Sequence, residues 1–171
     1  AVDYVPHPKT RPALLEDGTF GSQKKNEHRH AMLRRFFELA HEMGIKFIYH
    51  SIGYDVYVLI YQLFMKDILD QEGLLYGLQI MLGDDGRNWD CTKLITYLAT
   101  NSCAGNKLGL KDQSQEYCGN YAMENITDIR RIPLPDLLQY NLVDGLATWY
   151  VYNKHWNTLV ADEQEPIYRE L

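Results

Sequence analysis

The segment FIYHSIGYDVYVLIYQL, residues 47–63, joins two different periodicities within a short length of chain. Its first part belongs to a compact run of β-forming residues, 45–50, which predicts a strand. Its second part predicts a helix that begins near Tyr54 and continues through residue 69, apolar around much of its circumference and therefore buried on more than one side. A strand followed at once by a packed helix is typical of an α/β layer architecture.

The flanking segments extend this alternation of helices and strands. Residues 26–44 have apolar positions at helical spacing and end at Gly44, a common helix stop signal. Residues 71–90 have alternating, strand-like character before a turn at 84–86. Helices are predicted over 91–100 and 110–122, and Pro133 and Pro135 open a last long helix from about Asp136 to beyond Val160.

The chain length is that of one domain. With 171 residues, 46% of them hydrophobic and 23% charged, the chain resembles ordinary globular proteins rather than disordered ones. We therefore expect a single domain over 1–171, with a strand and loop at 1–26 and a main body at 27–162. Residues 163–171 are predicted to start a connection to a following domain.

Composition excludes several classes of function. No apolar run reaches the roughly 20 residues that cross a bilayer, so no membrane partner is expected. Cys91, Cys103 and Cys118 form no C-x-x-C pair, which argues against a disulfide framework or a zinc site. The net charge of −6 argues against a broad surface that coats nucleic acid, but it permits an acidic site that grips a few phosphates through metal ions.

Three polar residues interrupt otherwise apolar helices. Asp55 follows the strand at 45–50 and falls in the first turn of a helix, where a carboxylate is favoured by the helix dipole. Tyr140 and Asp144 are four residues apart on the last helix, so they project from the same face. Each taken alone is explained by a helix cap or by a hydrogen bond at the edge of the core.

Together, HSIGYD at 50–55 and YNLVD at 140–144 resemble the second and third motifs of a nuclease family. That family is the DEDD-type 3'-5' proofreading exonuclease domain of family A, polymerase I-like, DNA polymerases, specifically those of bacteriophages. The intervening segment WDCTKLITYLATNSCAGNKLGLKDQSQEYCGNYA, 89–122, resembles the family as well, and the resemblance covers roughly residues 47–157.

The resemblance implies a ribonuclease-H-like fold, with a mixed sheet flanked by helices, and hydrolysis of the 3'-terminal phosphodiester of DNA. Two divalent ions, Mg²⁺ or Mn²⁺, would clamp the scissile phosphate and activate the attacking water. By similarity, Asp144 would bind the first ion and Asp55 would serve the second. The Tyr140 hydroxyl would orient the water, and Ser51 and Tyr54 would contact the DNA strand.

The implied partners are a single-stranded 3' end of DNA and a polymerase domain in the same polypeptide. The implied location is the cytoplasm of an infected bacterial host.

The chain departs from the family in two ways. Ser51 stands where the family has asparagine. The first motif, Asp-x-Glu, supplies two of the four carboxylates in the family, and it is missing before Phe47. The later Asp70-Gln71-Glu72 is in the wrong order to replace it. We therefore expect either a fragment of a longer polymerase, incomplete at its N-terminus, or a catalytically inactive domain that binds DNA or supports a neighbouring polymerase domain.

The remaining candidates have simpler interpretations. His28 and His30 are predicted to be solvated on a polar helix face. Four aromatic residues of the last helix could stack on unpaired bases, although core packing is the favoured interpretation; they are Trp149, Tyr150, Tyr152 and Trp156. Four basic residues could line a path for a single strand, with solvated surface as the default; they are Lys107, Lys111, Arg130 and Arg131. An unrelated globular interaction protein is a third possibility.

Overall fold

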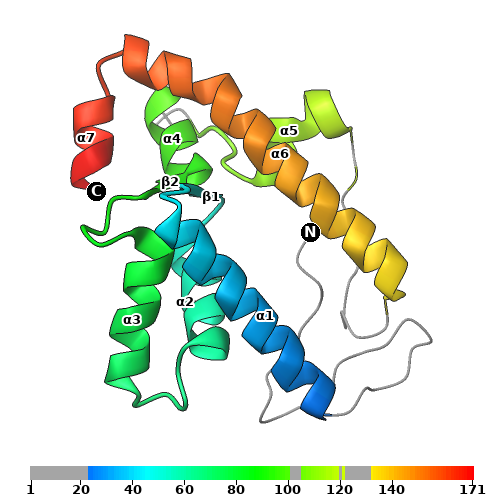
Figure 1. Ribbon diagram of the computed structural model, residues 1–171. Coiled ribbons are helices and arrows are strands. Elements are labelled where there is room, and N and C mark those ends of the chain that lie inside the picture. The colour runs from blue at the N-terminus through cyan, green and yellow to red at the C-terminus, as the bar shows by residue number, and fades with distance from the viewer. Residues whose placement is uncertain (1–22, 101–104, 120, 122–131) are drawn as a thin grey trace.

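The computed structural model describes residues 23–100, 105–119, 121 and 132–171. Within these residues the chain is mostly helical, with a small parallel sheet (Figure 1). The elements in chain order are α1 (Gln23–Glu42), β1 (Phe47–Tyr49), α2 (Ile52–Leu63), α3 (Gln71–Leu82), β2 (Trp89–Cys91), α4 (Thr92–Ala99), α5 (Leu110–Cys118), α6 (Leu134–Ala161) and α7 (Glu165–Glu170).

The two strands pair in parallel, with Phe47 opposite Trp89 and Tyr49 opposite Cys91. Parallel strands need a crossover connection, and here α2 and α3 form it. The expectation of a mixed α/β fold is therefore confirmed. The described residues form a two-stranded sheet, so the ribonuclease-H-like fold itself stays a prediction.

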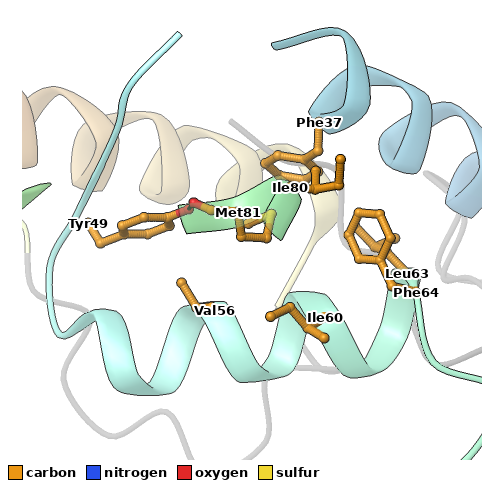
Figure 2. Close-up of a cluster of buried hydrophobic side chains, with 8 residues drawn as sticks. All are labelled: Phe37, Tyr49, Val56, Ile60, Leu63, Phe64, Ile80 and Met81. Carbon is orange, nitrogen blue, oxygen red and sulfur yellow. Dashed lines mark hydrogen bonds between the residues drawn. The ribbon is translucent and has the colours of Figure 1, made fainter. Parts of the chain in front are cut away.

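A first hydrophobic core lies between α1, β1, α2 and α3 (Figure 2). From α2, Val56 and Ile60 point toward Met81 of α3, whose backbone carbonyl accepts a hydrogen bond from the Tyr49 hydroxyl at 3.2 Å. Phe37 of α1 covers the other side of the cluster. This core fixes the end of β1 relative to α2, and so it fixes the position of the residues between them.

A second core lies on the other side of the sheet, where α6 packs against α4 and α5 and crosses the upper part of the molecule (Figure 1). Ile95 of α4, Leu159 of α6 and Tyr168 of α7 are its buried members. Helix α6 also contacts β1, and the α6 residues that share a pocket with the strand, 144–149, lie near the middle of the long helix. This contact sets the geometry of the candidate site.

The strand-like prediction for residues 71–90 is wrong, because 71–82 form helix α3. The Asp70 carboxylate caps this helix by accepting a hydrogen bond from the Gly73 backbone N–H at 2.9 Å. Gly77 then lies against Ile60 of α2, and Ile80, three residues on, is buried in the first core. Over a few residues, a short apolar run fits both the two-residue period of a strand and the 3.6-residue period of a helix. Here the N-terminal cap at Asp70 favours the helix.

Other boundaries shift without changing the type of element. The predicted strand at 45–50 shortens to 47–49, and the helix predicted through residue 69 ends at Leu63. Helix α1 begins at Gln23, inside the segment expected to be a loop, and Gly44 follows it with φ of 66°. The helices α4, α5 and α6 are confirmed, whereas the strand predicted near the N-terminus lies outside the described residues.

Residues 163–171, expected to be a connection, include the short helix α7, whose Tyr168 is buried. Among the helices in the described ranges, none combines the length and apolar character that crossing a membrane would require.

Candidate functional site

A pocket of about 610 Å³ opens beside β1, α2 and α6. Asp55 lines it from the first turn of α2, and Asp144 lines it from α6. Lys46 and His50, on either side of β1, and Trp149, on α6, are further residues that line it. His50 and the start of α2 follow β1 directly, so they lie on one side of the pocket. The contact between α6 and β1 places Asp144 on the other side.

Two carboxylates therefore share this pocket. The pKa of Asp55 is raised above its ordinary value, first by burial and second by the negative charge of Asp144. A raised pKa from a like charge means that the two groups lie within electrostatic reach of one another. The structure thus brings together two residues that the sequence predicted to converge, from helices far apart in the chain.

Tyr121 holds one side of this pair. Its hydroxyl donates a hydrogen bond to Asp144 Oδ1 at 2.7 Å. The bond to that carboxylate and burial both raise the pKa of Tyr121, with burial the larger cause. The sequence predictions missed this residue, because no local motif surrounds it and only the packing of the chain against α6 brings it to Asp144.

Tyr140 lies on α6 beside Tyr121 and Lys111. Its ring lies 5.8 Å from the ring of Tyr121, and the Lys111 ammonium sits 4.8 Å from its ring centre. It is not among the residues that line the pocket. Among the described residues none forms a hydrogen bond with the Tyr140 hydroxyl, and the phenol in contact with Asp144 is Tyr121. A role for Tyr140 in orienting water stays a prediction.

Ser51 and Tyr54, the predicted DNA contacts, lie at the start of α2. Ser51 adopts a left-handed backbone conformation, with φ of 65° and ψ of 55°, and does not line the pocket. Asparagine is favoured over serine in this conformation. Tyr54 is 73% exposed and points to solvent rather than into the pocket.

His50 is a further pocket residue that the site predictions did not include. Its Nδ1 lies 2.8 Å from Thr92 Oγ1, and the Thr92 hydroxyl lies 3.2 Å from the Tyr49 carbonyl oxygen. Burial lowers the pKa of His50, and the nearby Lys93 ammonium lowers it further. His50 is therefore held neutral and oriented at neutral pH, beside the two aspartates.

The donor set at the pocket suits a hard divalent cation. Within the described ranges, no group of three or more histidine, cysteine, aspartate or glutamate side chains converges on a potential metal position. Mg²⁺, however, is commonly held by one or two carboxylates together with water and substrate phosphates. Asp55 and Asp144 could supply those two carboxylates, and a phosphate oxygen would supply another ligand.

Other sequence candidates fall elsewhere. His30 is 7% exposed and its Nδ1 lies 3.2 Å from the Gln62 carbonyl oxygen, so the prediction that it is solvated is wrong. His28 is exposed, as expected. Lys107 pairs with Asp112 at 3.6 Å. Arg130 and Arg131 lie outside the described residues.

The aromatic residues of α6 do not form one buried group. Tyr150 stacks on Tyr117, with ring centroids 4.6 Å apart. Tyr152 and Trp156 are partly buried against the second core, as the core-packing interpretation expected. Trp149 is 57% exposed and lines the pocket, so core packing does not explain it.

A scan against protein-family models and searches of the curated proteins and the solved structures found no match for this chain. The resemblance to the exonuclease family therefore rests on the motifs at 50–55 and 140–144 and on the segment between them.

Proposed function

We propose that this chain is the 3'-5' exonuclease domain of a phage family A DNA polymerase and that its pocket binds the single-stranded 3' end of DNA with a divalent cation. The observation that supports it best is that Asp55 and Asp144, from separate motifs and separate helices, line one pocket. The expected partners are DNA and a polymerase domain in the same polypeptide, in the cytoplasm of an infected bacterial host.

The electrostatics of the pair favour a cation between or beside the two carboxylates. The negative charge of Asp144 disfavours ionisation of Asp55, and a divalent ion would relieve that repulsion. Carboxylate oxygens are the ligands that Mg²⁺ and Mn²⁺ prefer. A bound cation would supply Lewis-acid activation of the scissile phosphate and of water.

The residues around the pair would position the site. Tyr121 fixes one oxygen of Asp144, Oδ1, through its hydrogen bond, and so would hold the carboxylate in place at the pocket. His50, neutral and anchored to Thr92, would contact DNA or water without adding charge. These contacts would orient the groups before DNA binds.

A second candidate is a DNA-binding domain without hydrolysis. It is favoured by the donor set, because the described part of the pocket has two carboxylates where the family uses four. Two carboxylates hold one cation better than two, so binding could persist with weak or no cleavage.

Both candidates are tested with the 171-residue chain and a 5'-labelled single-stranded oligodeoxynucleotide in Mn²⁺. We expect the chain to bind this DNA only when Mn²⁺ is present and to shorten it slowly from the 3' end, as followed on a denaturing gel. Asp144→Asn should weaken Mn²⁺-dependent binding and shortening by about a hundredfold or more. Mutating a residue that only contacts a metal ligand already lowers metal affinity or activity about 10- to 100-fold, and Asp144 would be a ligand itself.

Asp136→Asn is the matched control, because Asp136 is an exposed aspartate in the first turn of the same helix. It should leave binding and shortening unchanged. Binding without shortening would favour the inactive domain. Shortening that survives Asp144→Asn at the wild-type rate would rule out the assigned role of the pair.

A further inference from the structure

Three aromatic side chains form a stacked series along one side of α6. The rings of Trp149 and Tyr152 are 5.8 Å apart with an interplanar angle of 13°, and those of Tyr152 and Trp156 are 5.3 Å apart with an angle of 18°. Beyond Trp156 the series is closed, because Tyr168 packs edge-on against it and the Arg169 guanidinium lies 5.2 Å from its ring centre. One end of the series is therefore covered by protein.

The other end opens into the pocket. Trp149 is 57% exposed and lines the same pocket as Asp144. Asp144 precedes it on α6 by five residues, a little over one helical turn. Tyr152 accounts for the contact on one side of the indole. An indole this exposed at a polar pocket loses the hydrophobic stabilisation that burial would provide, so packing alone does not explain its position.

Gly145 keeps the space beside Trp149 open. It is four residues before Trp149, so it lies one turn earlier on the same face of α6, and helical side chains lean toward that preceding turn. A Cβ atom at Gly145 would have no neighbouring heavy atom within 4 Å, and Gly145 itself lines the pocket. A glycine inside a helix is less stable than alanine by about 1 kcal/mol. Here it leaves the next place in the aromatic series empty.

We infer that an unpaired nucleobase occupies this place, stacked on Trp149 over Gly145, as the next ring of the series. The inference rests on the proposed function, because it takes the occupant to be the 3'-terminal nucleotide whose phosphate lies at Asp55 and Asp144. Stacking accepts any base, since every base has a π-face, so this contact would bind the terminal nucleotide without reading its sequence.

The test compares two oligothymidylates that differ only in the 3'-terminal residue, which carries its base in one and is abasic in the other. Their affinities for the 171-residue chain are measured by fluorescence anisotropy with Ca²⁺ in place of Mn²⁺. We expect wild type to bind the complete oligonucleotide about tenfold more tightly than the abasic one, as stacking of one base predicts.

Two variants should abolish this difference by separate routes. Trp149→Ala removes the stacking surface, and Gly145→Leu fills the space while keeping the indole. Leu146→Ala is the control, since Leu146 is exposed on the same helix and does not line the pocket. Circular dichroism melting checks that each variant is folded, and the use of two variants keeps the test decisive if one of them is not.

Equal binding of the two oligonucleotides by wild type, or a full base preference in both folded variants, would overturn the inference. The failure of the proposed exonuclease function has a different signature. In that case the base preference is present and depends on Trp149, while no 3' nucleotide is lost in Mn²⁺.

Discussion

Asp55 occupies a position that is unfavourable for an ionised carboxylate. The side chain is half-buried, lies beside a second aspartate, and has a raised pKa for both reasons. Its place in the first turn of α2 provides some compensation through the helix dipole, but the net effect still disfavours the charge. Carboxylates held in this way are typical of functional sites, where stability is lower than it could be.

A pH-dependent gain in stability on Asp55→Asn follows from this position. Because the folded chain holds the Asp55 proton more tightly than the unfolded chain, the stability contributed by this carboxyl is highest at acidic pH. This stabilisation decreases as the pH rises from the pKa of Asp55 in the unfolded chain, about 3.9, through its raised pKa in the folded chain. Asp55→Asn should therefore raise the free energy of unfolding at neutral pH, and the gain should vanish below about pH 4.

Urea denaturation of the variant and of wild type at several pH values, without divalent cations, measures this gain. A stability difference that does not change with pH would contradict the assigned electrostatic strain. Asp136→Asn provides the comparison: Asp136 is exposed in the first turn of α6, where the helix dipole favours its charge, so this variant should not raise the free energy of unfolding at neutral pH.

At the scale of elements, the close approach of α2 and α3 depends on a glycine. A Cβ at Gly77 would lie 2.6 Å from Ile60 Cγ2 and 3.2 Å from Phe64 Cβ, both in the first core. Ile60 is fully buried in the first core, so it has little room to move aside. The position is therefore fixed by packing between helices rather than by the helix itself.

Gly77→Ala should destabilise the protein by about 1 to 3 kcal/mol, because overpacking outweighs the gain in helix propensity. Gly53→Ala is the matched comparison, since Gly53 is also helical but has no atom within 4 Å of its ideal Cβ. It should stabilise the protein by about 0.5 kcal/mol. Chemical denaturation of the two variants measures both values, and a stabilising Gly77→Ala would show that α2 and α3 are not this close.

At the scale of the whole molecule, Asp90 ties the C-terminal helix to the sheet. This buried carboxylate on β2 accepts a hydrogen bond from the Tyr168 hydroxyl at 3.1 Å and from Arg169 Nη1 at 3.0 Å, and Lys46 Nζ lies 3.2 Å from its other oxygen. The Tyr168 hydroxyl also accepts from the Cys91 N–H at 2.8 Å. These hydrogen bonds join α7 to β2, and through Asp90 they reach Lys46, which lines the pocket.

Tyr168→Phe should lower the free energy of unfolding by about 2 kcal/mol, because it leaves the buried Cys91 N–H unsatisfied and removes a donor from a buried charge. Tyr97→Phe, at a tyrosine that is 44% exposed on α4, should change stability by no more than about 0.5 kcal/mol. Thermal or urea unfolding measures both variants. Equal effects would mean that the Tyr168 hydroxyl does not join α7 to the sheet.

Local periodicity and caps in the sequence determined most of the elements of this protein. The apolar spacing and Gly44 predict α1, the prolines predict the start of α6, and the β-forming run predicts β1, because each signal acts within a few turns of chain. Helix α3 was mispredicted because its apolar run fits two periods, and its packing at Gly77 lies outside the local pattern.

Only the tertiary structure decided how the site is assembled. The motifs predicted that Asp55 and Asp144 converge, but the packing of α6 on β1 is what brings them to one pocket. The same packing brings Tyr121 to Asp144 and leaves Trp149 exposed beside it. These contacts join residues far apart in the chain, so their geometry depends on how whole helices pack, and local sequence does not encode that.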